Sequence, residues 1–297
     1  MNEVPSALRI WVLAARPKTL PAALVPVLVG SAFAARAGAF RWETAALCLG
    51  FALLVQIGTN FANDYFDHIQ GADTEKRVGP ARAVASGWVP PATMRAAMWT
   101  TFGAALCVGL GLIPFGGWGL LPLGLLCILC GIAYTGGPYP LGYHGLGDVF
   151  VFLFFGLVAV GATFWVQTRT LSPDVLLAAA AIGGLAANIL VANNYRDRAT
   201  DVVAGKRTLV VRFGERAGRL QYGAAVALSG LVPVALWWRG FGAGPLLALG
   251  ALPLGLLCWR RLRPATPAPE LIRLLARTAA HLALFGLLLS AGLLLGA

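Results

Sequence analysis

Nine long apolar stretches constrain what this chain can fold into. A helix needs roughly 20 predominantly apolar residues to cross a bilayer, and only 12% of this chain is charged against about 25% in soluble proteins. Because the bilayer core offers no water to backbone groups, uninterrupted apolar runs of this length indicate helices rather than a barrel. We therefore predict an all-α polytopic membrane protein with nine transmembrane helices. They are expected at about residues 19–36, 43–62, 93–112, 116–134, 146–166, 174–195, 217–238, 244–262 and 276–296.

The distribution of Lys and Arg predicts the orientation. With the N-terminus in the cytoplasm and the C-terminus outside, 19 of the 23 basic residues lie on the cytoplasmic side, as the positive-inside rule requires. A missed span would exchange all later loops and remove this asymmetry, so the distribution supports the count of nine. We expect residues 1–297 to form a single membrane domain in the bacterial cytoplasmic membrane. The four exceptions are Arg36, Arg41, Arg169 and Arg239.

The basic residues and the cysteines do not indicate further partners. The net charge of +11 sits at the membrane edges without any nucleic-acid-binding motif, so membrane lipid and not nucleic acid is the expected partner of these bases. All five cysteines fall within predicted spans. Cys127 and Cys130 form a CxxC, but no second pair accompanies them, and packing is the expected role.

Two polar loops contain a repeated segment. NDYFDHIQGADTEKR begins at Asn63 and NNYRDRATDVVAGKR begins at Asn193, a constant offset of 130 residues. Four predicted spans separate the copies, so both emerge on the same face as a parallel repeat over residues 63–82 and 193–212. A third polar loop, YTGGPYPLGYHGLGD at 134–148, is expected on that face too. The identities pair Asn63 with Asn193, Tyr65 with Tyr195, Asp67 with Asp197, Lys76 with Lys206, Arg77 with Arg207 and Arg82 with Arg212.

The acids of the repeat predict a site for Mg²⁺. Residues four apart share one face of a helix, so the NxxxDxxxD spacing of the second copy stacks three oxygen-bearing side chains. In the first copy Gly71 occupies the third position and is expected to end or bend the helix, with Asp73 following. Oxygen ligands without His or Cys select hard cations such as Mg²⁺. The candidate ligands are Asn63, Asp64, Asp67, Asp73, Asn193, Asp197 and Asp201.

The bases beside these acids predict an anionic ligand. A diphosphate would bridge the metal ions and accept charge-assisted hydrogen bonds from Lys and Arg. Solvated loop charges are the alternative and would explain the bases, but not why 7 of the chain's 12 acids lie in the three loops. The candidate diphosphate-binding residues are Lys76, Arg82, Arg196, Lys206 and Arg207.

These motifs resemble the UbiA superfamily of intramembrane aromatic prenyltransferases, which carry NDxxDxxxD-like and DxxxD segments after the second and sixth spans. The resemblance implies helices around a central cavity capped by cytoplasmic loops. Within the superfamily, ARPKTLPAALVPVLVG, GPARAVASG, GGPYPLGYHGLGD and GKRTL are similar to the branch that prenylates 1,4-dihydroxy-2-naphthoate in menaquinone biosynthesis. The spacing of Asp67 and Asp73 is wider than the superfamily pattern.

The resemblance also implies the chemistry. The substrates would be a polyprenyl diphosphate and 1,4-dihydroxy-2-naphthoate, and Mg²⁺-assisted ionisation of the donor would precede attack by the aromatic carbon and loss of CO₂ and diphosphate. Asp67, Asp197, Asp148 and Tyr139 are the candidate catalytic residues, although Asp148 could equally cap the fifth span. Aromatic side chains would shield the allylic cation. Tyr134, Tyr143 and His144 are the candidates for contact with the acceptor or the prenyl chain.

Two alternatives stay open at the level of sequence. A related enzyme with another acceptor, such as 4-hydroxybenzoate, homogentisate or a tetrapyrrole, would share most of these motifs, but the hydroxybenzoate enzymes usually carry a YPxxKR-like third loop where this chain has YTGGPYPLGY. A membrane transporter would show acids in mid-span or broken helices in matched halves. Here the acids map to the ends of the spans.

Overall fold

The computed structural model describes residues 5–72, 79, 81–264 and 266–296, which contain helices and no β-strand. Four of the described segments depart from α-helical geometry: η2 and η3 are π-helical, and η1 and η4 are 3₁₀-helical. The elements are α1 (Ala7–Ala15), η1 (Pro17–Thr19), α2 (Pro21–Arg36), α3 (Trp42–Ile69), α4 (Pro91–Leu110), α5 (Ile113–Gly116), α6 (Leu120–Ala133), α7 (Gly147–Val151), η2 (Phe152–Val158), α8 (Ala159–Thr168), α9 (Pro173–Val203), α10 (Leu209–Leu236), η3 (Trp237–Phe241), η4 (Gly244–Ala251), α11 (Leu252–Arg261) and α12 (Ala268–Leu295).

The helices agree with a multi-pass membrane protein. Every predicted apolar stretch is occupied by one helix or by consecutive helices. Five helical segments in the described residues are long and apolar enough to cross a membrane, and α1 to α2, bent by 53°, would make a sixth. The all-α, membrane-spanning class is thus confirmed, whereas the number of nine crossings stays a prediction.

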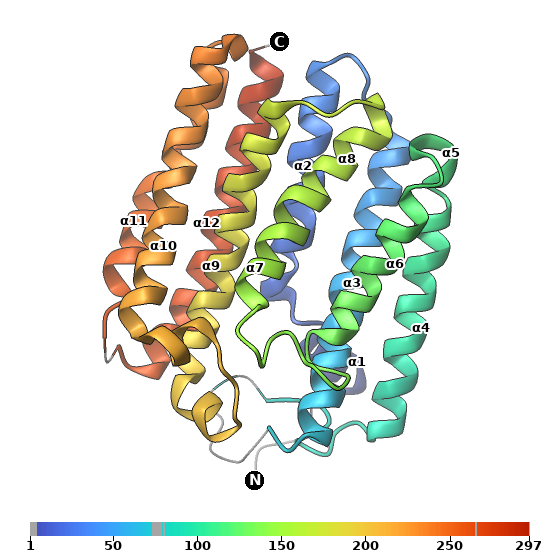
Figure 1. Ribbon diagram of the computed structural model, residues 1–297, viewed down its shortest axis with the longest axis vertical. Coiled ribbons are helices and arrows are strands. Elements are labelled where there is room, and N and C mark those ends of the chain that lie inside the picture. The colour runs from blue at the N-terminus through green and yellow to red at the C-terminus, as the bar shows by residue number, and fades with distance from the viewer. Residues whose placement is uncertain (1–4, 73–78, 80, 265, 297) are drawn as a thin grey trace.

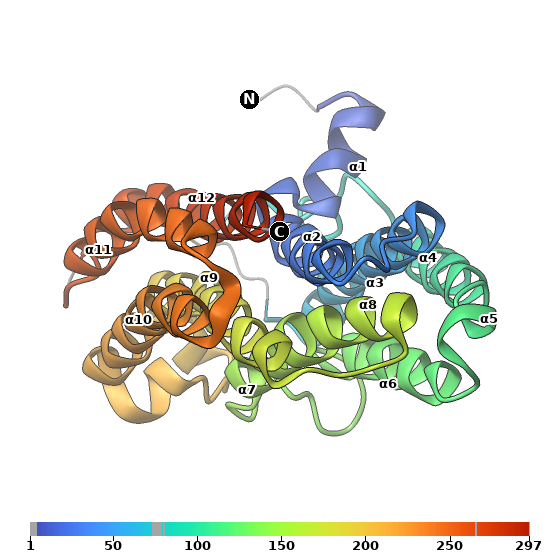
Figure 2. The same cartoon turned by 90° about the horizontal axis from the view of Figure 1, so that it is seen from above.

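The helices stand side by side as one bundle, with α10 and α11 on one side and α4, α5 and α6 on the other (Figure 2). α1 and the C-terminal end of α12 lie at opposite ends of the bundle, and the loops after α3, α6 and α9 gather at the end near α1 (Figure 1). α12 packs against α2, α9 and η4. The long polar loops therefore meet at one end of the bundle, which holds the candidate site.

Small residues allow the central helices to approach closely, as is common where helices pack in a bilayer. α9 buries a run of alanines against α2, η2 and α12. Gly183 of α9 faces Gly156 of η2 so closely that a Cβ on Gly183 would lie 2.5 Å from the carbonyl oxygen of Phe152. This contact fixes η2 against α9 and orients the opposite side of η2 toward the interior of the bundle.

Candidate functional site

The two copies of the repeated segment end their helices in the same way but at different places. α3 ends at Ile69, and Gly71 follows with a φ of 69°, the left-handed conformation that glycine adopts readily. α9 continues to Val203 before Gly205 takes a φ of 71°. The second copy thus has one more helical turn. That turn carries Asp201 on the helix, whereas the predicted end of the first helix at Gly71 is confirmed.

A polar cavity opens where the ends of α3 and α9 meet the three loops. It is lined from both copies of the repeat and also from the break between α1 and α2 and the loop after α6. The convergence of three loops on one face is confirmed by these contacts. The polar and charged residues that line it are Arg16, Thr19, Gln56, Thr59, Asn60, Asn63, Asp67, Arg82, Tyr134, Thr135, Tyr143, Asn193, Asn194, Arg196, Asp197, Asp201, Lys206 and Thr208.

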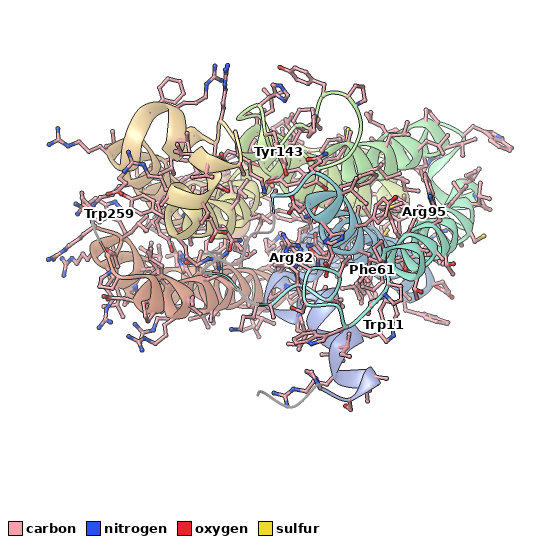
Figure 3. All side chains as sticks on the ribbon, turned by 90° about the horizontal axis from the view of Figure 1, so that it is seen from below. Trp11, Phe61, Arg82, Arg95, Tyr143 and Trp259 are labelled. Atoms are coloured by element: carbon pink, nitrogen blue, oxygen red, sulfur yellow. The ribbon has the colours of Figure 1, made fainter. Side chains whose placement is uncertain are left out.

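Asp67 is the centre of this cavity. The residue is 2% exposed, and its carboxylate accepts hydrogen bonds from Arg82 Nη2 at 2.8 Å, from Tyr143 Oη at 2.8 Å and from Lys206 Nζ at 3.2 Å. The three donors come from the three different loops, and Arg82 and Tyr143 lie near the centre of this end of the molecule (Figure 3). Lys206 Nζ also lies 4.6 Å above the Tyr143 ring. One buried carboxylate therefore ties all three loops to the end of α3.

The matching acid of the second copy has a different partner. Asp197 accepts two hydrogen bonds from the neighbouring Arg196, at 2.7 Å from Nε and 2.6 Å from Nη2. Arg212, which pairs with Arg82 in the repeat, does not line the cavity and lies over the ring of Phe213. The sequence repeat is therefore not reproduced as a symmetric set of ion pairs.

The charges that line the cavity favour an anion. Among the residues that the structure describes, four cations, Arg16, Arg82, Arg196 and Lys206, line the cavity with three carboxylates, those of Asp67, Asp197 and Asp201, so 4 − 3 leaves a net charge of +1 for this part of the lining before any metal ion binds. Inside a partly desolvated cavity such an excess acts more strongly than on an open surface. A multiply charged anion with its metal ions would complement this set.

The sequence did not predict that one face of α3 and the non-helical residues between α1 and α2 line the cavity together. Gln56, Asn60, Asn63 and Asp67 follow spacings of four, three and four and so share the face of α3 that lines the cavity. Gln56 Nε2 donates to Thr19 Oγ1 at 3.0 Å, and Asn60 Nδ2 donates to the Ala15 carbonyl at 2.9 Å. The spacing of these residues on α3 could be seen in the sequence. Their contacts with the segment between α1 and α2 could not.

Arg16 lines the same wall. It takes a φ of 53°, which is uncommon for a residue with a Cβ, at the point where α1 ends. The following Pro17 disfavours continuation of the helix through Arg16. In the sequence Arg16 belongs to the ARPKTL segment of the family resemblance but was not a candidate site residue, and its place in the cavity depends on this backbone break.

Asp64 lies beside the cavity rather than in its lining. Its carboxylate accepts hydrogen bonds from the backbone N–H groups of Ala83 (3.0 Å) and Val84 (3.2 Å), and all three residues are at most 3% exposed. This contact holds the loop that carries Arg82. The ligand role predicted for Asp64 stays a prediction, while its contacts give it a structural role.

The Asp64→Ala variant is expected to be less stable by about 2 to 4 kcal/mol, since each of two buried N–H groups would lose its acceptor. The measurement is the thermal unfolding midpoint of the purified protein in detergent. Glu43→Ala, at an exposed position in the first turn of the same helix, serves as the control. Equal midpoints for the two variants would contradict the structural role of Asp64.

Several predicted site residues lie outside the linings of the two cavities described here. Tyr139 is 57% exposed and stacks on His144 at 3.6 Å between ring centroids. Arg207 is exposed, and its backbone N–H donates to the Tyr143 carbonyl at 2.7 Å. Asp148 is buried and accepts a hydrogen bond from Gln221 of α10 at 2.9 Å. The roles predicted for these four side chains stay predictions.

The remaining predicted residues divide into two groups. Tyr134 and Tyr143 line the polar cavity, as do the ligand candidates Asn63, Asn193 and Asp201. The Asn63 Oδ1 atom accepts a hydrogen bond from Thr135 at 2.8 Å. The predictions for Asp73 and Lys76 fall outside the described residues.

The chemistry of the cavity suits Mg²⁺. In the described part of the chain no group of three or more His, Cys, Asp or Glu side chains is placed to hold a metal ion. Asp67 and Asp197 instead form ion pairs with Arg82, Lys206 and Arg196. The donors around the cavity are carboxylate and amide oxygens, which hard cations prefer. A metal ion bound here would neutralise part of the negative charge of these two carboxylates, which Arg and Lys side chains neutralise in this structure.

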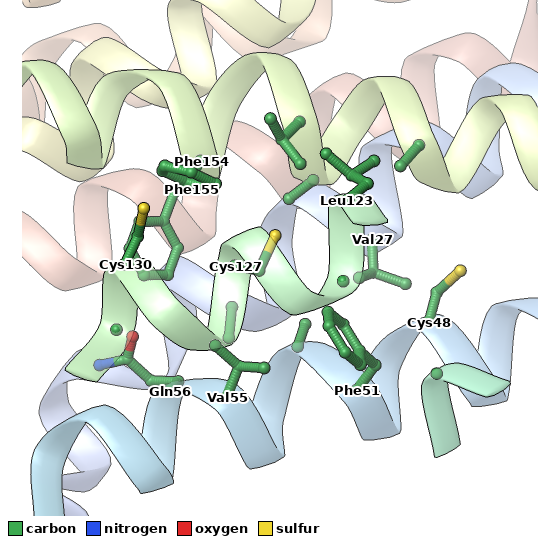
Figure 4. Close-up of a pocket in the computed structure, with 18 of the residues that line it drawn as sticks. Val27, Cys48, Phe51, Val55, Gln56, Leu123, Cys127, Cys130, Phe154 and Phe155 are labelled. Carbon is green, nitrogen blue, oxygen red and sulfur yellow. The ribbon is translucent and has the colours of Figure 1, made fainter. Parts of the chain in front are cut away.

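A second cavity, which is apolar, continues from the polar one. It runs between α2, α3, α6 and the α7–η2–α8 segment, and Figure 4 shows Phe51, Leu123, Cys127, Cys130, Phe154 and Phe155 among its lining. The consecutive residues Phe154 and Phe155, both in the π-helical segment η2, line it. π-helical segments are frequent at functional sites. The residues common to both cavities are Gln56, Thr59, Tyr134, Val151 and Phe155.

Comparison with known proteins establishes the class. The model of the UbiA prenyltransferase family matches residues 23–276. The chain is 38% identical to the 1,4-dihydroxy-2-naphthoate octaprenyltransferase of Mycobacterium tuberculosis, over 96% of this chain and 97% of that protein. It is 40% identical to the Escherichia coli enzyme of the same name, over 78% of this chain and 77% of that protein. This chain therefore belongs to the UbiA prenyltransferase family.

The fold agrees with this membership. A UbiA homolog from Archaeoglobus fulgidus, whose structure holds GPP and Mg²⁺, superposes with a TM-score of 0.64 at 17% identity, covering 95% of this chain and 99% of that one. An apo UbiA homolog from Aeropyrum pernix K1 gives a TM-score of 0.65 at 15% identity, with 94% and 97% covered. At these identities the likeness concerns the fold alone.

Proposed function

We propose that this protein transfers a polyprenyl group from an allylic polyprenyl diphosphate to 1,4-dihydroxy-2-naphthoate, with release of CO₂ and diphosphate, to give the prenylated naphthoquinol of menaquinone biosynthesis. The acceptor is that of its relatives, several of which are named 1,4-dihydroxy-2-naphthoate octaprenyltransferase at 36% to 40% identity. The donor class is supported by the family and by a structural neighbour that binds GPP and Mg²⁺.

The observation that carries the proposal is the joining of two unlike cavities. In the described part of the chain, one cavity is lined by both acidic segments and four cations, the other is apolar, and five residues belong to both. A prenyl diphosphate has the same two parts, a multiply charged head and a hydrocarbon tail. The reacting carbon, which lies between head and tail, would sit beside Tyr134, Thr59 and Phe155.

Each part of the wall has a task in this reaction. Mg²⁺, held by oxygen atoms of Asn63, Asp67, Asn193, Asp197 and Asp201, would neutralise the departing diphosphate when bound. Arg82, Arg196 and Lys206 would hold the diphosphate through charge-assisted hydrogen bonds. Phe155 and Tyr134 would exclude water where the C–O bond breaks, and their ring faces would stabilise the allylic cation. The naphthoate carbon then attacks this cation, and the carboxylate leaves as CO₂.

The direct test is a transfer assay. The protein, purified in detergent, is incubated with geranyl diphosphate and Mg²⁺ plus 1,4-dihydroxy-2-naphthoate, 4-hydroxybenzoate or homogentisate in separate reactions. Prenylated product from the naphthoate alone, lost on addition of EDTA and restored by excess Mg²⁺, is the expected result. If another acceptor gave more product, that acceptor would be the substrate in place of the naphthoate. No product with any acceptor would contradict the proposed activity.

We also propose that the chain crosses the cytoplasmic membrane nine times as a single domain, with the N-terminus and the polar cavity on the cytoplasmic side. Positive-inside counting and the placement of α1 and the end of α12 at opposite ends of the bundle support this orientation. Reporter fusions test it: alkaline phosphatase after residue 296 should be active, and the same reporter within the loop after α9 should be inactive. The opposite pattern would reverse the topology.

A further inference from the structure

One face of α6 forms a wall of the apolar cavity. The helical spacing of its lining residues runs without interruption from the junction with the polar cavity to the far end of α6. Its middle part carries small side chains, which leave the cavity open there, whereas both ends carry large ones. The residues on this face are Leu120, Leu123, Gly124, Cys127, Cys130, Gly131 and Tyr134.

The length of this face can be compared with a prenyl chain. From Tyr134 to Leu120 the helix advances 14 residues (134 − 120), or about 21 Å at 1.5 Å per residue. An extended isoprene unit contributes four backbone bonds and so about 4.5 Å, by proportion to the three bonds of an extended peptide residue. The wall therefore matches roughly four to five isoprene units, with Cys127 at the depth of about two units and Gly124 at about three.

The far end of the cavity is lined by a buried cluster. Val27, Cys48, Leu112 and Val166 all line the cavity, are at most 7% exposed, and pack together with Leu120. An eight-unit chain, about 36 Å when extended, exceeds the 21 Å wall, so its last units would have to fold back or leave between helices. The first units are those that the small residues of α6 contact.

We propose that Cys127 and Gly124 determine donor chain length, because their small side chains keep the apolar cavity open at the depth of the second and third isoprene units. This inference rests on the proposed function, since it assigns the apolar cavity to the donor's prenyl chain. A bulky residue at either position would act as a stop, and the deeper position would admit about one unit more.

The structure shows which substitution fits. A Cβ on Gly124 would meet the Phe51 ring at 3.6 Å, an ordinary van der Waals distance, so the backbone of α6 accepts a side chain there. At Gly131, in contrast, a Cβ would lie 2.5 Å from Thr59 Oγ1, and substitution would disturb the packing of α3 against α6. Gly124 and Cys127 are therefore the informative positions.

The experiment measures kcat/KM for donors of two, three, four and eight isoprene units in the Cys127→Phe and Gly124→Phe variants. Even one methylene too many in a hydrophobic pocket typically costs about 10- to 200-fold in kcat/KM. Cys127→Phe is expected to stay within about threefold of wild type with the two-unit donor and to lose at least about tenfold from three units upward. Gly124→Phe is expected to show the same loss only from four units upward.

A control and a second readout keep the outcomes separate. Gly103→Phe introduces the same ring on α4, where nothing lies within 4 Å of a Cβ, and should leave the chain-length profile unchanged. The same order of cut-offs is expected in the thermal stabilisation that each donor gives, which requires no turnover.

Equal losses with all donors, partial or complete, or no loss in either variant would contradict the inference. If wild type forms no product but the stabilisation shows the two cut-offs, the proposed function fails and the assignment of the apolar cavity to the prenyl chain stands.

Discussion

Replacing Asp67 by asparagine is expected to lower kcat/KM for prenyl transfer by about 100- to 1,000-fold, the usual loss when one preorganised electrostatic group at a reacting centre is removed. Asp67 is the buried carboxylate that joins the three loops, and it lines the polar cavity together with the second acidic segment. Asparagine keeps the size of the side chain but removes its charge. The variant would lose affinity for Mg²⁺, and it would also lose the negative charge that neutralises Arg82 and Lys206.

The control for Asp67→Asn is Asp174→Asn. Asp174 lies in the first turn of α9, at the opposite end of the bundle, where it pairs with the exposed side chain of Arg239. This variant should keep wild-type transfer within about threefold, because exposed ion pairs contribute little. Thermal unfolding of both proteins shows whether Asp67→Asn is folded. Activity of folded Asp67→Asn within threefold of wild type would remove Asp67 from the catalytic machinery.

Replacing Lys206 by methionine is expected to raise the KM for the polyprenyl diphosphate by about 10- to 100-fold, the range for loss of a hydrogen bond from a charged donor. The Lys206 ammonium group reaches Asp67 and the Tyr143 ring and lines the polar cavity. Methionine preserves most of the length of the side chain and its contact with the ring. The loss should therefore fall on binding of the diphosphate more than on kcat.

Two further variants serve as controls for Lys206→Met, one at a cation outside the cavity and one that retains the charge at position 206. Arg198→Met removes a cation near the C-terminal end of α9, whose side chain is 46% exposed and paired with Glu215 outside the cavity lining, and it should leave the KM unchanged. Lys206→Arg retains the charge and should recover part of the affinity. A KM for Lys206→Met equal to that of Arg198→Met would show that position 206 does not contact the donor.

The helices and the acidic segments were predictable from the sequence because each leaves a local signal. Apolar runs predicted the described helical regions except α1, which lies before the first predicted stretch, and the constant offset of 130 residues predicted that Asp67 and Asp197 would lie on one face. Gly71 was recognised as a helix end because a left-handed residue there favours glycine. The extra turn of α9 also follows from the later position of Gly205.

The remaining parts of the site depend on tertiary contacts that leave no local signal. The side chain of Asp64 has the same chemistry as that of Asp67, and only the position of Ala83 and Val84 directs it to a loop backbone. Asp148 pairs with Gln221, 73 residues away. The junction of the two cavities is formed by residues of α3, of the end of α6 and of the α7–η2 segment, which are far apart in the sequence.

The stoichiometry of the reaction tests the central claim most directly. Purified protein is given an allylic polyprenyl diphosphate, Mg²⁺ and 1,4-dihydroxy-2-naphthoate carrying a radiolabelled carboxyl carbon, and CO₂, diphosphate and prenylated naphthoquinol are measured together. Equal amounts of all three, and none of them in EDTA or with Asp67→Asn, are the expected result. Diphosphate released without labelled CO₂ and without prenylated product would contradict the transfer reaction proposed for these two joined cavities.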